Sequence, residues 1–296
     1  TSLEEGTLPA VLKAERLYLL ADKADGVYFS DGRQYVHIGK EEADTALSDV
    51  FSSGAALFTF GAKPFYKAAR RLGFAKTQTL FDAELAAYLL KPDAKTYDVA
   101  ALARSYVSGA TIEGPEDLAA LAVLPRLCSE LYEQLCAQEM DTLFNEIELP
   151  LCEVLADMEY EGFAVDRAGV EEFGRMLDEG IAEVTEEIYR LAGRHFNINS
   201  TRELGEVLFE ELKLPAGKKT KTGYSTSAEV LESIAALHEI VPAVLEYRKL
   251  SKLASTYVTG LLKVVGEDGR VHSTFNQTET RTGRISSSEP DVQNIP

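Results

Sequence analysis

The stretch "FNQTETRTGRISSSEPDVQNIP", Phe275 to Pro296, decides how the fold of this chain is interpreted. Just before it, "GEDGRV" predicts a turn, and "VHSTFNQTET" predicts a strand because β-favouring residues alternate along it. The strand leads into a polar loop that carries two long hydrogen-bond donors, Arg284 and Gln293. Natural domains seldom end in this way, so we expect the parent protein to continue past Pro296.

The region upstream of this stretch is predicted to be mainly helical. Asp166 is placed to cap a helix that ends at Gly193, and its apolar residues recur every three or four positions. Ser200 with Glu203, and Thr226 with Glu229, have the spacing of capping boxes. A further long helix is predicted from Pro242, which suits a first turn, to about Val265.

The first part of the chain has a different pattern. Short apolar runs separated by turn signals predict three or four strands between Arg16 and Gly61. A short helix closed by Gly73, a strand in "TQTLFD" and a helix stopped by Pro92 follow. Strands followed by alternating helix and strand predict a compact α/β domain, with a boundary between about residues 115 and 140.

Composition limits the kinds of partner. The 296 residues carry a formal net charge of -18, which would repel phosphate from most of the surface, so any nucleic-acid contact must be local. No apolar run of about 18 residues or secretory leader is present, and we expect a soluble, cytoplasmic protein. Cys128, Cys136 and Cys152 lack zinc-site spacing and are predicted to be reduced core thiols.

The last segment, through its "TGRISS" and "PDVQNIP" parts, resembles the segment that precedes the first catalytic palm motif in bacterial family A DNA polymerases of the DNA polymerase I type. "MEYEGFAVD", "FNINSTRELGEVLFEEL" and "LEYRKLSKLASTYVTGLL" also resemble family segments, so the resemblance covers about residues 143–296. It implies an α/β ribonuclease H-like (3′-5′ exonuclease-like) domain at 1–135. A polymerase region at 136–296 would follow, with a mainly α-helical thumb at about 166–265 and the first palm strands at 266–296.

The resemblance also implies a set of DNA contacts. Every Watson–Crick pair displays a minor-groove acceptor at nearly the same place, so a long donor can test pair geometry without reading sequence. By resemblance Arg284 would do this at the primer terminus, and Gln293 with Asn294 would contact the nascent pair or template. Asp291 stands where the family commonly has Asn, and because an acid would weaken a DNA contact we leave it out. The palm-side set is Asn276, Gln277, Thr282, Arg284, Gln293 and Asn294.

A second implied set lies in the thumb. "GKKTKTGYSTSAEVLE", Gly217 to Glu232, resembles the thumb tip, whose lysines and hydroxyls would grip the duplex backbone. Two cations four residues apart on one helix, Arg248 and Lys252, could follow the phosphates of one strand. Without the resemblance, these are a solvated loop and an exposed helix face. The thumb set is Lys218, Lys219, Lys221, Ser225, Thr226, Ser227, Arg248 and Lys252.

The α/β domain lacks the carboxylates that a two-metal exonuclease needs. The first-strand signature Asp-x-Glu is replaced by Asp22 followed by Ala24, and the later helices lack the other expected acids. Asp22, Asp25, Asp82 and Asp98 are predicted to be turn and cap residues. No catalytic or metal-binding residue is therefore expected in this chain, and the domain would be an inactive scaffold.

The predicted function is that of the front part of a DNA-directed DNA polymerase. The parent would be a monomer that binds primer-template DNA and deoxynucleotide triphosphates, with Mg²⁺ held by residues beyond this chain. The fragment itself would bind duplex without transferring nucleotides. Two alternatives are a divergent 3′-5′ exonuclease and a non-enzymatic DNA-binding or interaction scaffold.

Overall fold

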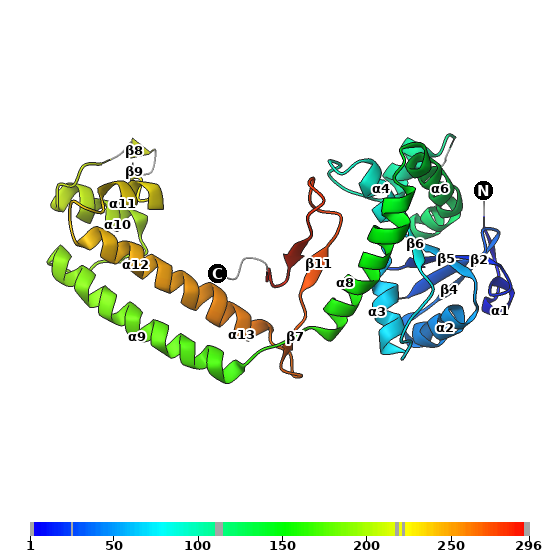
Figure 1. Ribbon diagram of the computed structural model, residues 1–296, viewed down its shortest axis with the longest axis horizontal. Coiled ribbons are helices and arrows are strands. Elements are labelled where there is room, and N and C mark those ends of the chain that lie inside the picture. The colour runs from blue at the N-terminus through cyan, green and yellow to red at the C-terminus, as the bar shows by residue number, and fades with distance from the viewer. Residues whose placement is uncertain (1–2, 25, 110–114, 217–218, 221–222, 293–296) are drawn as a thin grey trace. The chain divides into compact units, whose positions relative to one another are not determined.

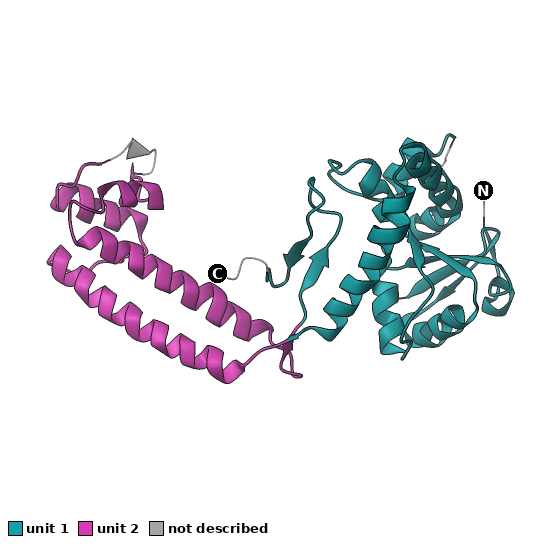
Figure 2. Cartoon of the chain, in the orientation of Figure 1, with its two compact units in different colours: residues 1–163, 272–294, 296 teal, residues 164–271, 295 magenta. Residues whose placement is uncertain are grey.

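A computed structural model describes residues 3–24, 26–109, 115–216, 219–220 and 223–292, with the side chains of 219–220 left out. Two compact units divide the chain. Residues up to Phe163 form the first together with the segment from His272 onward, and residues Ala164–Val271 form the second (Figure 2).

The first unit is built on a mixed sheet. Among the described residues it has six strands in the order β1-β4-β3-β2-β5-β6. β2 pairs antiparallel with β3 and β3 with β4, whereas β2 with β5, β5 with β6 and β1 with β4 are parallel. The strands are β1 (Glu4–Glu5), β2 (Arg16–Ala21), β3 (Val27–Ser30), β4 (Gln34–Ile38), β5 (Ala56–Thr59) and β6 (Leu80–Asp82).

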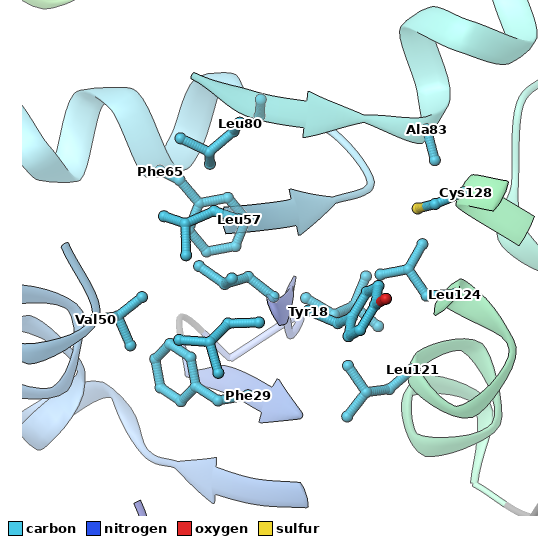
Figure 3. Packing of buried hydrophobic residues seen from close by; sticks show 14 of the residues in the cluster. Tyr18, Phe29, Val50, Leu57, Phe65, Leu80, Ala83, Leu121, Leu124 and Cys128 are labelled. Atoms are coloured by element: carbon cyan, nitrogen blue, oxygen red, sulfur yellow. The ribbon is translucent and has the colours of Figure 1, made fainter. Parts of the chain in front are cut away.

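Helices cover both faces of this sheet, as Figures 1 and 3 show. Val50 of α2 and Phe65 of α3 lie on one side of the strands, and Leu121 and Leu124 of α6 lie on the other. Each fully buried leucine contributes about 1.5–3 kcal/mol to folding. The helices are α1 (Leu8–Val11), α2 (Lys40–Ser52), α3 (Lys63–Arg71), α4 (Ala83–Leu90), α5 (Val99–Tyr106), α6 (Glu116–Ala137), α7 (Asp141–Leu143), the π-helical η1 (Phe144–Glu148) and α8 (Leu149–Glu161).

The predicted elements of the α/β part are confirmed. β2 to β5 fall between Arg16 and Gly61, α3 is followed by Gly73 at φ +85°, and α4 ends before Pro92. The cysteine prediction holds for Cys128 and Cys152, which are buried, and is wrong for Cys136, which is exposed. Burial raises the pKa of both buried thiols.

The compact units do not coincide with the predicted boundary at residues 135/136. Helix α8 packs on α3, and Arg70 on α3 forms ion pairs with Glu153 at 2.9 Å and Asp157 at 2.5 Å. These partly buried pairs join α8 to the α/β domain. The predicted thumb, 166–265, lies within the second unit, whereas most of the predicted palm, 266–296, belongs to the first.

The second unit is dominated by a long helix pair, α9 beside the run of α12, η3 and α13 (Figure 1). Gly174 lets these helices approach closely, since a Cβ there would lie 2.9 Å from Cγ1 of Val258. Asp166 and Gly193 bound α9, as predicted. The helices are α9 (Arg167–Ala192), α10 (Thr201–Gly205), η2 (Glu206–Glu211), α11 (Ala228–Ile234), α12 (Ile240–Lys252), η3 (Leu253–Thr259) and α13 (Gly260–Val264).

Short strands complete the chain. Apart from the sheet already described, these are β7 (Phe163–Ala164), β8 (Lys219–Thr220), β9 (Gly223–Tyr224), β10 (Arg270–Val271), β11 (Thr274–Asn276) and β12 (Ser286–Ser288). β8 and β9 pair antiparallel where the sequence predicted a loop. No helix in the described ranges is long and apolar enough to span a bilayer.

Candidate nucleic-acid interface

The hairpin formed by β11 and β12 carries Arg284. Thr274 pairs with Ser288 and Asn276 with Ser286, so the chain between the two strands forms a projecting loop. Gly283, at φ +75°, allows that loop to turn in a conformation that side chains disfavour. Thr282 and Arg284 are both exposed beside it. The guanidinium of Arg284 is exposed next to a hydrogen-bonded strand pair, so it can donate to an acceptor on a ligand.

Asn276 is held within the hairpin. Its Nδ2 donates to Oε2 of Glu279 at 3.0 Å and to Oγ of Ser288 at 3.1 Å. Ser287 is buried and donates to Oδ1 of Asp291 at 2.8 Å, so the acid that we left out of the DNA set is engaged inside the fold. The hydrogen bonds fix the strand pairing and leave the loop exposed.

Gln277 has a different environment from the one predicted. Its side chain is 6% exposed, and Nε2 donates to the backbone carbonyl of Glu148 at 3.0 Å and to Oε2 of the same residue at 2.7 Å. Its Oε1 finds no hydrogen-bond partner among the described residues. A buried amide that is bound to Glu148, the last residue of η1, cannot also face DNA in this conformation, so the geometry gives the predicted contact at Gln277 no support.

At the predicted thumb tip, Ser227 caps α11, with its Oγ accepting from the amide of Val230 at 3.5 Å. The prediction of Thr226 as the cap is wrong by one residue, because Thr226 is buried and bound to Arg248. The guanidinium of Arg248 donates to Oγ1 of Thr226 at 3.0 Å and also to its carbonyl oxygen. Ser225 lies next to this link and is within 3.5 Å of Ser227 through their hydroxyl oxygens.

Arg248 and Lys252 therefore differ, although the sequence placed them on one ridge. Arg248 is partly buried, and burial lowers its pKa. Lys252 is exposed at the end of α12. Both line a groove of about 450 Å³ between α11 and α12, to which Lys249 and Glu246 also contribute. Lys252 is therefore open to solvent, whereas the guanidinium of Arg248 is bound to Thr226.

Several predicted contacts lie outside the described residues: Lys218, Lys221, Gln293 and Asn294. The backbone of Lys219 is in β8, and Asp25 of the α/β domain is also outside the described residues.

Three of the aspartates predicted to act in turns and caps, Asp22, Asp82 and Asp98, do so. Asp22 accepts from the amides of Ala24 and Gly26, both at 2.7 Å, and Asp98 caps α5. Asp82 is 3% exposed and accepts from the amides of Gly61, Ala62 and Glu84. Across the described chain, no three His, Cys, Asp or Glu side chains gather as metal ligands would.

Beside Asp82 lies a cavity of about 270 Å³ whose lining includes Glu84, Lys63 and Gln277. Burial, followed by the nearby charge of Asp82, raises the pKa of Glu84 to about 7. Its Oε1 accepts from Oγ1 of Thr278 at 3.1 Å. A carboxyl group of the α/β domain thus contacts the loop that leads to Arg284.

Sequence reasoning missed a second buried acid, Glu159 on α8. It is 5% exposed and binds Lys63 at 2.6 Å, Lys67 at 2.8 Å and the amide of Phe275 at 2.9 Å. A signal was present: Cys152, Leu155, Ala156 and Glu159 have the spacing of one buried helix face, and an acid at such a position needs a partner.

The amino-acid sequence of this chain is similar to those of known proteins. Residues 167–296 match the model of DNA polymerase family A. The chain is 47% identical over 237 residues to DNA polymerase I of Geobacillus stearothermophilus, covering 73% of this chain and 27% of that protein. It is 41% identical over 260 residues to DNA polymerase I of Bacillus subtilis, covering 81% of this chain and 29% of that protein.

A solved structure agrees with this assignment. The POL domain of Pol1 from M. smegmatis, in complex with DNA primer-template and dNTP, has a TM-score of 0.81 and 30% sequence identity to this chain. The likeness covers 100% of this chain and 55% of that one. The chain spans 27% and 29% of the length of the two curated relatives above. From the family match, the identities and the shared fold, this chain belongs to DNA polymerase family A.

Proposed function

We propose that the protein containing this chain is a template-directed DNA polymerase, and that the chain supplies parts that hold the primer-template duplex. The observation that carries the proposal is the β11–β12 hairpin, which lies within the family match and exposes Arg284. Minor-groove acceptors occupy nearly the same place in all four base pairs, so this donor can contact any correct primer terminus. Lys252, Ser225 and Ser227 would hold the duplex through its phosphates, which fixes register without sequence preference.

The α/β domain is proposed to be ribonuclease H-like and related to 3′-5′ exonucleases, without their activity. The antiparallel β2–β3–β4 meander followed by parallel β5 and β6 supports this assignment. Phosphodiester hydrolysis by two metal ions requires several carboxylates around shared ions. Asp22, Asp82 and Asp98 instead accept backbone N–H groups. Their use in turns and caps supports a structural role.

Nucleotide transfer in the whole protein is proposed to use Mg²⁺. The ions would assist attack of the primer 3′-hydroxyl on the α-phosphate of a deoxynucleotide triphosphate, and acidic oxygens are their usual ligands. The described carboxylates of this chain do not fit such a site, because no three of them converge. The ligands are therefore assigned to parts of the protein beyond this chain, and no catalytic residue is proposed within it. A cytoplasmic monomer belongs to the same proposal.

A primer-extension assay tests this function. With Mg²⁺, primer-template and all four triphosphates, the full-length protein should extend the primer, whereas this chain alone should bind duplex weakly and add no nucleotide. Incorporation by this chain would contradict the proposed division of labour. Release of nucleotides from single strands that is lost in Asp22→Ala would favour the exonuclease alternative. Absence of any duplex binding by the full-length protein would favour an interaction scaffold.

A further inference from the structure

The segment from His272 to Ser288 is attached to the rest of the first unit by buried or partly buried polar contacts. The strongest centre is Glu159 on α8. Its Oε1 accepts from Nζ of Lys63 at 2.6 Å and from the amide of Phe275 at 2.9 Å. Lys63 also donates to the carbonyl oxygen of Phe275. Both polar groups of Phe275 are thus bound by one ion pair, which joins α3 and α8 to β11.

At this centre one carboxylate, Glu159, faces two ammonium groups, those of Lys63 and Lys67. Burial acts to raise the pKa of Glu159, but hydrogen bonds from Lys63, Lys67 and Phe275 together hold it below its ordinary value. The carboxylate therefore stays ionised, and both of its oxygens continue to accept hydrogen bonds. Because a buried ion that loses its partner is costly, the pair resists separation.

A second attachment comes from α4. The hydroxyl of Tyr88 donates to the carbonyl oxygen of Thr280 at 2.7 Å, and Glu84 accepts from Thr278 at 3.1 Å. Tyr88 is 3% exposed, so its ring is fixed within the α/β core. Thr280 in turn donates to the carbonyl oxygen of Arg284. A short chain of contacts therefore runs from the core of the α/β domain to the backbone of the residue proposed to meet the minor groove.

We propose that the α/β domain acts as a support that positions Arg284, with Tyr88, Glu84 and Lys63 as positioning residues. This inference rests on the proposed function, since it assigns a purpose to Arg284 at the primer terminus. It goes further by giving a domain whose described residues form no metal-ligand cluster a part in recognising the terminal base pair. A domain that contributed only to folding stability would not be expected to alter discrimination between matched and mismatched termini.

The first test removes one hydroxyl from the full-length protein. Tyr88→Phe deletes the bond to Thr280 and leaves the ring. Tyr97→Phe is the matched control, because its hydroxyl donates to the carbonyl of Lys91 at 2.7 Å, and the substitution keeps the ring that packs edge-on against Tyr88. Without DNA, amide hydrogen exchange across residues 276–286 should become about two- to tenfold faster in Tyr88→Phe, the range for one lost hydrogen bond, and stay unchanged in Tyr97→Phe. Equal exchange in both variants would overturn the inference.

The second test measures dissociation constants for primer-templates with a matched or a mismatched terminal pair. In Tyr88→Phe the ratio of mismatched to matched constants should fall by about two- to fivefold, consistent with loosening of one hydrogen bond, while Tyr97→Phe keeps the wild-type ratio. An unchanged ratio in Tyr88→Phe would contradict positioning. If the wild-type protein does not bind duplex at all, the proposed function fails, and the DNA-free exchange still shows whether Tyr88 holds the loop.

A charge-matched pair checks the other attachment. Lys63→Met and Lys67→Met each remove one ammonium from Glu159, but only Lys63 also binds the carbonyl of Phe275. Exchange at residues 274–276 and the mismatch ratio should change in Lys63→Met at least about twofold more than in Lys67→Met. Equal effects would mean that the cations serve only to balance Glu159.

Discussion

Arg248 binds both oxygens of Thr226, the side-chain hydroxyl and the backbone carbonyl. One guanidinium nitrogen lies 3.0 Å from Oγ1, and another donates to the backbone carbonyl. Thr226 is 5% exposed, so neither oxygen can turn to water if the arginine is lost. The relationship links α12 to the segment that carries Ser225 and Ser227, both proposed to contact phosphate.

Arg248→Lys should therefore destabilise the protein although it keeps the positive charge. Lysine lacks the planar fork that bonds both oxygens, and a buried acceptor left unmatched costs about 1–3 kcal/mol. Urea denaturation should show that loss in the free energy of unfolding. Lys252→Arg, at an exposed position on the same helix, should remain within about 0.5 kcal/mol of wild type. Similar stabilities for the two variants would argue that the Thr226 link contributes little.

Lys252→Met should weaken duplex binding in a salt-dependent way. Each lost phosphate contact removes about 0.9 from the slope of log affinity against log salt concentration. The loss should be the same for duplexes of any sequence, because phosphates carry no base identity. Titrations of the full-length protein from about 50 to 200 mM salt measure the slope. A wild-type slope in Lys252→Met would remove this residue from the interface.

Arg284→Met should weaken binding of a matched primer terminus by about 1.5–3 kcal/mol, the range for a hydrogen bond to a charged group. The loss should be equal for all four terminal pairs, since each presents a minor-groove acceptor at the same place. Arg281→Met, an exposed neighbour in the same loop, is the matched control and should bind nearly as wild type. A loss confined to one base pair would instead indicate sequence recognition.

Glu84→Gln should make stability less dependent on pH. Burial raises the pKa of Glu84 from 4.5 to about 7, so the folded protein holds this proton more tightly than the unfolded chain does. That contribution to stability is complete below about pH 4.5 and is lost as pH rises to about 7. Above pH 7, Glu84→Gln should be more stable than wild type by about 1–3 kcal/mol, and the difference should shrink toward pH 4.5.

Thermal or urea denaturation at several pH values checks this window. Glu133→Gln, on an exposed position of α6, supplies the control and should follow the wild-type curve. A gain in Glu84→Gln that appears only under acidic conditions would have the wrong sign and would contradict the burial of this carboxyl.

Local rules were enough for many elements of the fold. Asp166 and Gly193 bound α9 because a side-chain acceptor satisfies the first amides of a helix and glycine tolerates a left-handed end. The β8–β9 pair was missed, because the lysine-rich sequence around it predicts a loop. So was the π-helical run η3 within the predicted thumb helix. Strand pairing and helix packing depend on tertiary contacts, which the conformational preferences of single residues do not determine.

The candidate site divides in the same way. Arg284 could be named from its motif, and it is exposed, whereas Gln277 in the same motif is buried against Glu148. Arg248 and Lys252 share one ridge in sequence, yet one is bound to Thr226 and the other faces solvent. The spacing of two residues on a helix shows that their side chains lie on the same face. It does not show which other part of the chain packs against each of them.

The sequence by itself determined the family, the order of helices and strands, and the absence of the expected exonuclease signatures. These depend on residue type and spacing along the chain. Only the tertiary structure decided that α8 and the β11–β12 hairpin join the α/β domain. The ion pair of Glu159 with Lys63, 96 positions away, and the bond from Tyr88 to Thr280, 192 positions away, form only when distant segments meet and exclude water. Burial then gives each polar group a specific partner, because an unpaired one would be costly.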